Sequence, residues 1–152
     1  MKKRLRFTVL LAAWVLAVSA SLLAQADTLV VLNKSEASAS LIDLESGVVR
    51  ATLPTSRGPH EAAISPDGRL ALVGNYGTRE KRGATLTVIN VPAATVLRTI
   101  DLGEYRRPHG LLFLRDGRHA LVTAEDNKAL LLVDVNKGVV EAAFATQADV
   151  SH

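Results

Sequence analysis

One phrase of this sequence is written twice. The first copy begins at Arg57 and reads RGPHEAAISPDGRLALVGNYG; the second begins at Arg106 and reads RRPHGLLFLRDGRHALVTAEDN. A shift of 49 positions superposes the Pro-His, Asp-Gly-Arg and Leu-Val elements of the two copies. A partial earlier copy begins with LVVLN at Leu29. Self-similarity at this period predicts a repeat protein, in which each copy is one structural unit that packs on its neighbours.

Within one copy the pattern predicts four short strands. EAAIS leads into the turn SPDG, where Pro followed by Asp-Gly favours a tight hairpin. LALVGN, TLTVIN and VLRTIDL follow, with apolar and β-branched residues alternating along them. Beyond residue 26 no stretch shows an apolar period of 3.6 residues. Four strands repeated every 40 to 50 residues or so are typical of a β-propeller blade, so we expect an all-β propeller.

The copies set the expected domain organisation. Residues 28–58 supply only the last three strands of a blade, whereas 59–107 and 108–151 each supply a full blade, and His152 starts the next. A propeller ring needs about 4 to 8 blades, and fewer than three are present. We therefore expect an incomplete ring, the N-terminal portion of a longer protein whose remaining blades close it. Self-assembly of copies of this chain is the alternative.

The N-terminus predicts export. Four cationic residues among the first six precede an apolar run from Phe7 to Leu23, and small residues at Ala24 and Ala26 form a cleavage site. These are the three parts of a signal peptide, so residues 1–26 are expected to be removed and the mature protein to begin at Asp27 in the periplasm or outside the cell. A retained membrane anchor is the alternative, but we expect no stable membrane span after cleavage.

Charge and cysteine content narrow the possible partners. Residues 27–152 carry fourteen basic and fifteen acidic side chains, a net charge of −1. The basicity of the whole sequence therefore belongs to its first residues, and general attraction to nucleic acid is not expected. The chain has no cysteine, which excludes disulfides and thiolate metal sites.

The repeat resembles a known family. The phrase PHEAAISPDGRLALVGN, then LTVINVPAATVLRTIDLG and a second PH, is similar to the YVTN-type β-propeller repeat of exported prokaryotic proteins. Two departures stand out. The YVTN tetrad, from which the repeat takes its name, reads LVGN and LVTA here, and the second hairpin turn reads LRDG. The resemblance implies a propeller over residues 28–152. It also admits an enzymatic alternative, because similar propellers include lactonases, quinoprotein subunits and haem d1 domains.

Three histidines occur in repeat phase. His60 and His109 follow the two prolines, and His152 falls at the same position of the next copy. Equivalent positions at the channel mouth could bring three imidazoles together around a metal. The competing interpretation, which we favour, is a repeat element that bonds the adjacent blade. Ser65 and Asp67, near His60, have the composition of a catalytic triad, but turn chemistry explains their spacing.

A second group of candidates lies in the loops expected on one face. Connections between strands two and three, and from strand four to the next blade, emerge on the same side of a propeller. Arginine beside tyrosine suits anionic or aromatic groups. The ligand-face candidates are Arg57, Tyr76, Arg79, Arg82, Tyr105, Arg106 and Arg107.

Two functions follow from these observations. The first is a non-catalytic binding or scaffold module that engages a protein, an envelope polymer or a small anion through this loop face, with no catalytic residue, metal or cofactor expected. The second, resting on fold analogy, is a periplasmic enzyme or redox-cofactor propeller of lactonase, quinoprotein or haem d1 type whose site lies mostly in other blades.

Overall fold

The computed structural model describes residues 27–150. The predicted signal peptide and His152 lie outside the described residues. The first sheet contains β1 (Thr28–Asn33), β2 (Ser38–Asp43) and β3 (Val49–Pro54). The second contains β4 (Pro59–Ile64), β5 (Leu70–Gly77), β6 (Arg82–Asn90) and β7 (Thr95–Asp101). The third contains β8 (Pro108–Phe113), β9 (His119–Ala124), β10 (Ala129–Asp134) and β11 (Val139–Ala145).

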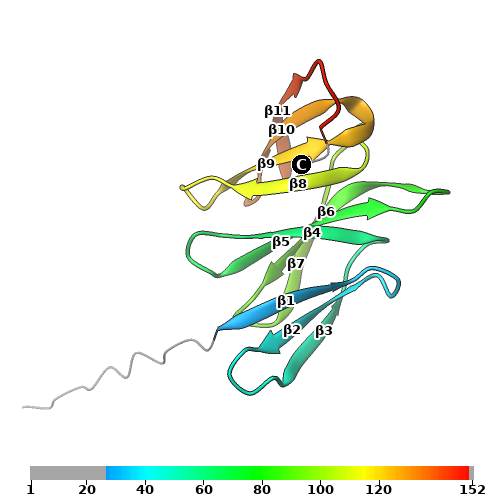
Figure 1. Ribbon diagram of the computed structural model, residues 1–152. Coiled ribbons are helices and arrows are strands. Elements are labelled where there is room, and N and C mark those ends of the chain that lie inside the picture. The colour runs from blue at the N-terminus through cyan, green and yellow to red at the C-terminus, as the bar shows by residue number, and fades with distance from the viewer. Residues whose placement is uncertain (1–26, 151–152) are drawn as a thin grey trace, which may run out of the picture.

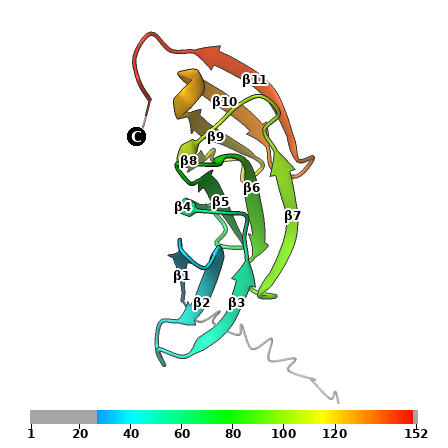
Figure 2. The same cartoon turned by 90° about the vertical axis from the view of Figure 1, so that its right-hand side faces the viewer.

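The three sheets stack face to face in chain order (Figure 1). Each is an antiparallel meander whose spatial order equals its sequence order. The view in Figure 2 shows β3, β7 and β11 along one side of the stack, with β4 and β8 nearer the other. This arrangement confirms the predicted fold class, an all-β partial propeller. The one helical segment within residues 27–150 is a 3-10 turn, η1 (Glu125–Asn127), and no helix there is long and apolar enough to cross a membrane.

The hairpin between β4 and β5 forms through side-chain to backbone bonds. The Ser65 hydroxyl donates to Asp67 at 2.6 Å and accepts from the Leu70 amide at 2.8 Å, while Asp67 accepts from the Arg69 amide at 3.0 Å. These bonds hold the pKa of Asp67 below its ordinary value, the Ser65 hydroxyl being the largest cause. His60 stands at the opposite end of β4. Ser65 and Asp67 therefore build a turn, as their spacing predicts.

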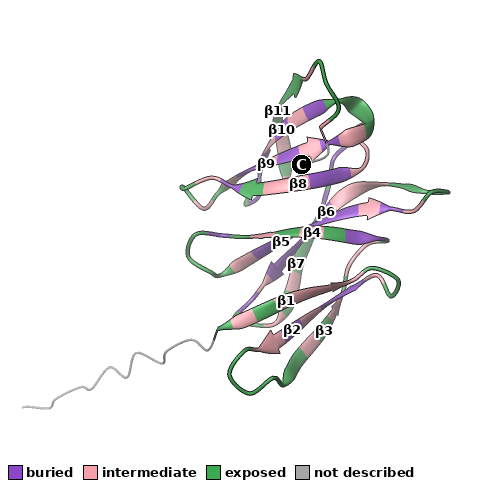
Figure 3. Ribbon diagram, in the orientation of Figure 1, coloured by how far each residue is buried: buried purple, intermediate pink, exposed green. Residues whose placement is uncertain are grey.

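Two apolar layers hold the sheets together. One lies between the first and second sheets and contains Ala39, Leu41, Ala71, Val73 and Ile89. The other lies between the second and third sheets, where β5 and β6 pack on β9 and β10. These residues are buried, as the purple segments of Figure 3 show. Burying one such side chain stabilises the fold by roughly 1.5 to 3 kcal/mol, so the stacking of sheets dominates the stability.

The repeat explains which positions face which neighbour. In the second sheet Leu72, Val88 and Ile100 face the third sheet and are almost fully buried. Strand pairing places Leu121, Leu132 and Phe144 at the equivalent positions of the third sheet. Of these, Phe144 is 55% exposed and the other two are partly buried. The apolar pattern is thus the same on both sheets even though its burial differs.

Candidate anion-binding site

One repeat position forms a row across all three sheets. It is the residue directly after the Asn or Ala near the end of β1, β5 and β9. These residues are Lys34, Tyr76 and Glu125. The Lys34 ammonium lies 5.6 Å from the centre of the Tyr76 ring. The Tyr76 hydroxyl donates to Glu125 at 2.9 Å. Equivalent residues of neighbouring blades therefore touch one another, and Tyr76 is fixed between them.

Arg107 completes the setting of Tyr76. Its guanidinium lies 4.6 Å from the ring centre, a cation–π distance. Arg107 has a φ of 56°, in the left-handed region, where the preceding copy places Gly58 with a φ of 63°. A side chain at such a position is strained, and contacts of its guanidinium offset the cost. Tyr76, followed by the nearby carboxylates Asp126 and Glu125, raises the pKa of Arg107.

The η1 turn of the third sheet supplies the acidic partners for this corner. Asp126 forms ion pairs with Arg82 at 3.1 Å and with Arg107 at 3.5 Å. Asn127 accepts from the Arg106 amide at 2.7 Å. The acidic side of the corner therefore belongs to the third sheet, and it ties down loops that belong to the second.

A hollow of about 720 Å³ lies beside this row. Its cations come from four different segments: Lys34 after β1, Arg57 before β4, Arg79 between β5 and β6, and Arg107 before β8. Among residues 27–150 no carboxylate forms an ion pair with Lys34, Arg57 or Arg79. Converging cations repel one another, and a bound anion relieves that repulsion.

Two carboxylates also line the hollow, Glu36 and Glu80. Thr78 is the largest cause that lowers the pKa of Glu80, and the positive charge of Arg57 lowers it further. Glu80 is therefore ionised at neutral pH and moderates the positive potential. The lining nevertheless carries four cations against two acids, so the hollow keeps an excess of positive charge.

The other ligand-face candidates lie outside this hollow. Arg82 pairs with Asp126, and Tyr105 packs against the apolar layer between the second and third sheets. The Arg106 guanidinium bonds the backbone carbonyl oxygens of Gly103 and Tyr105. The structure thus brings Arg57, Tyr76, Arg79 and Arg107 together around one hollow. Arg82, Tyr105 and Arg106 make the other contacts described above instead.

The two described histidines of the repeat lie side by side. The His60 and His109 rings are 4.7 Å apart between centres, and both contact the edge or face of Tyr76 at 5.3 and 5.4 Å. His60 is exposed, whereas His109 is 6% exposed, with its Nδ1 3.3 Å from a Glu61 oxygen. Their observed partners are thus aromatic rings and a carboxylate of the neighbouring blade.

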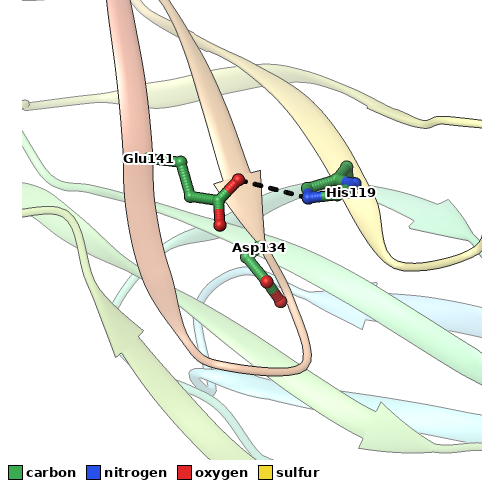
Figure 4. Close-up of side chains that lie close together, drawn as sticks. All are labelled: His119, Asp134 and Glu141. Atoms are coloured by element: carbon green, nitrogen blue, oxygen red, sulfur yellow. Dashed lines mark ion pairs between the residues drawn. The ribbon is translucent and has the colours of Figure 1, made fainter.

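A different group has metal-ligating composition, namely His119, Asp134 and Glu141. Their donor atoms lie within 4.8 Å of one another, the one such set among residues 27–150. Figure 4 shows Glu141 directed toward His119, with 3.2 Å between the paired atoms. Arg118 and Lys137 already pair with Asp134, and Lys137 also bonds Glu141 at 2.9 Å. The cations Arg118 and Lys137 thus already pair with both carboxylates, so we interpret the group as an ion-pair network.

Comparisons with known proteins support the fold. No family model and no curated protein matches the sequence. Among solved structures, hydrazine synthase of Kuenenia stuttgartiensis is similar at a TM-score of 0.70 and 21% identity, over 84% of this chain and 34% of that one. Dihydro-heme d1 dehydrogenase NirN in complex with DHE gives 0.67 and 20% over 79% and 24%. U3-55K gives 0.64 and 20% over 76% and 35%.

These likenesses concern architecture. The identities are low, and the chain spans between 24% and 35% of the length of the proteins it resembles. They support a β-propeller arrangement of blades. The activities named for two of those proteins belong to those proteins.

Sequence reasoning missed two residues of the site, Lys34 and Glu125. Both could have been found from the repeat phase, because each occupies the same repeat position as Tyr76. Glu125 lies in a copy whose Asn is replaced by Ala124. Contact between equivalent positions of adjacent blades is the signal that would have grouped all three.

Proposed function

We propose that this chain is part of an exported β-propeller whose loop face binds a small anionic ligand, and that it acts as a binding module without catalysis. The observation that carries the proposal is the convergence of Lys34, Arg57 and Arg79, three cations without ion-pair partners in residues 27–150, on one hollow. Arginine forks match the geometry of carboxylate and phosphate oxygens. A concave site favours a small ligand over a flat protein surface.

The setting of Tyr76 favours an anionic ligand over an aromatic one. The sequence suggested either an anion or an aromatic group. The Tyr76 ring already contacts Arg107, Lys34 and both repeat histidines, and its hydroxyl bonds Glu125. The ring therefore acts as a support that places the cations. Charge, more than stacking, is what the hollow offers to a ligand.

The proposed site binds its ligand by charge and hydrogen bonds. Guanidinium groups stay protonated and serve as donors, which suits them to hold an anion. The PHEAAISPDG phrase supports membership of the YVTN-type repeat family, and the N-terminal pattern supports export. Sequencing the N-terminus of the mature protein tests export: it should begin at Asp27, whereas retention of residues 1–26 in a membrane fraction would support an anchor.

Calorimetric titration of the natural full-length protein with inorganic pyrophosphate tests the binding site. We expect saturable binding that weakens as sodium chloride is raised, because salt screens exposed charges. Arg57→Gln should weaken binding about tenfold, the effect of one lost charge-assisted contact. Arg115→Gln removes the same charge from the turn between β8 and β9 and should leave binding unchanged. Equal weakening by both variants would show that only net charge matters.

A further inference from the structure

A second, smaller hollow adjoins the first. Its volume is about 350 Å³, and Arg57 and Gly77 line both hollows. Its other polar lining residues are Lys81, Arg82, Ser56, Thr85 and Asn75. None of the described residues that line it carries a carboxylate. Arg82 is engaged by Asp126, while Lys81 forms no ion pair within residues 27–150.

Asn75, which lines this second hollow, has one unsatisfied side-chain end. The side chain is fully buried, and its amide nitrogen bonds the hydroxyls of Thr85 and Thr87, each at 3.0 Å. Its Oδ1 is buried without a hydrogen-bond partner in the described part of the chain. If the amide is turned over, the oxygen accepts from the two hydroxyls and the NH₂ group becomes the unpaired end. Either orientation leaves one buried end of the Asn75 amide unsatisfied, which is rare in native proteins.

The backbone fixes the two hollows relative to each other. The Tyr76 amide donates to the Gly58 carbonyl at 3.0 Å, and the Gly77 amide donates to the Arg57 carbonyl at 3.1 Å. A Cβ atom added to Gly58 would lie 2.2 Å from the Gly77 oxygen, so the two segments are in direct backbone contact. The backbone of Arg57 therefore has a defined place between the hollows.

We propose that the ligand is a small oligoanion with at least two separate phosphoryl or carboxylate groups, one held in each hollow and Arg57 between them. This inference rests on the proposed function, because it specifies the ligand of the same site. Two linked anionic groups gain affinity since the second binds at a high effective concentration once the first is in place. The cations Lys34 and Arg79 hold one group, and Lys81 holds the other.

A series of phosphates of increasing length tests the inference on the natural full-length protein. Orthophosphate, pyrophosphate and tripolyphosphate are titrated separately at constant ionic strength. We expect affinity to rise at least about tenfold from orthophosphate to tripolyphosphate. Lys81→Gln should remove most of that rise while leaving orthophosphate binding in place. Arg79→Gln should weaken all three, and Arg115→Gln should weaken none.

The outcomes separate the inference from the proposed function. If orthophosphate and tripolyphosphate bind equally and Arg57→Gln still weakens both, a single-anion site exists and the two-hollow inference is wrong. If tripolyphosphate binds more tightly but Lys81→Gln and Arg115→Gln behave alike, the gain is nonspecific charge attraction and the inference again fails. If none of the three binds, both proposals fail.

Discussion

The connection that follows the second strand differs between the second and third sheets. In the second sheet, residues 78–81 extend a hairpin that presents Arg79 and Lys81 without ion-pair partners in residues 27–150. In the third sheet the same connection is the η1 turn, whose Glu125 and Asp126 bind Tyr76, Arg82 and Arg107. The connection in the second sheet thus carries the cations without ion-pair partners. The connection in the third sheet carries the acids that position Tyr76, Arg82 and Arg107.

The buried polar positions at the ends of the strands vary among the three sheets in a more constrained way. In the second sheet Asn75 bonds Thr85 and Thr87, and in the first sheet Asn33 bonds Ser38 and Ser40 at 3.0 and 2.9 Å. The third sheet has Ala124, Ala129 and Leu131 at these three positions. All three polar groups are replaced together, so none is left unpaired in the core. The comparison teaches that the framework changes in sets and the connections change freely.

The close backbone contact between β5 and β6, at the base of the cationic hairpin, should give the largest effect on stability. A Cβ atom at Gly83 would lie 1.7 Å from the Asn75 carbonyl oxygen, so Gly83→Ala forces the backbone of β5 and β6 apart. We expect a loss of about 4 kcal/mol in the free energy of unfolding, measured by denaturant titration. Gly68→Ala is the control: its φ is +72° but open space surrounds it, and it should cost about 1 kcal/mol. Equal losses in the Gly83→Ala and Gly68→Ala variants would contradict the close contact of Gly83 with the Asn75 carbonyl oxygen.

The polar set in the second sheet should be replaceable only as a unit. Asn75→Ala alone leaves the buried Thr87 hydroxyl and the half-buried Thr85 hydroxyl without this donor and should lower the free energy of unfolding by about 2 kcal/mol. Adding Thr85→Ala and Thr87→Leu copies the third sheet at nearly conserved volume and should recover more than half of that loss. Denaturant melts of the single and triple variants decide the matter. A triple variant no more stable than Asn75→Ala would mean that the two sheets are not interchangeable there.

The link between the two connections should contribute less. Tyr76→Phe removes this hydrogen bond, and Glu125→Gln keeps an acceptor but removes its charge, so a double-mutant cycle isolates the charge-assisted part of the bond. We expect a coupling of about 1 kcal/mol in unfolding experiments. Pairing Tyr76→Phe with Glu45→Gln, in the distant turn between β2 and β3, should give no coupling.

The ion-pair network around His119 predicts a pH dependence. Asp116, the largest cause, raises the pKa of His119, and bonds from the His119 and Arg118 amides help to lower that of Asp116 to about 2. A raised histidine pKa stabilises the fold below the ordinary value of 6.5 and ceases to do so as pH rises through the raised value. The lowered pKa of Asp116 stabilises above 3.8 and is lost as pH falls toward 2.

Unfolding at several pH values tests this network. The wild-type protein should be more stable at pH 5.5 than at pH 8, and His119→Gln should reduce that difference. His60→Gln, at the opposite rim, serves as the control and should retain it. A pH difference unaffected by His119→Gln would assign the dependence to other groups.

The sequence was informative where the repeat enforces a pattern. The Pro-His starts at Pro59 and Pro108, the Asp-Gly turns and the alternating strands all follow from local chemistry, and the structure confirms the all-β propeller fold. The hollow was harder to predict, because its cations come from connections far apart in the chain. Loop composition indicated Arg57, Arg79 and Arg107, but not that Arg82 would be paired by an acid of the next blade.

The most direct test of the account is where an anion binds. Backbone amide NMR shifts of the natural full-length protein are followed during titration with pyrophosphate. We predict changes concentrated at residues 34–37, 57–58 and 76–81, with small changes at Glu125–Asn127, whose acids face the neighbouring arginines. Shifts concentrated elsewhere, or absent at saturating pyrophosphate, would contradict the claim that the unpaired cations of the first two sheets form an anion-binding site.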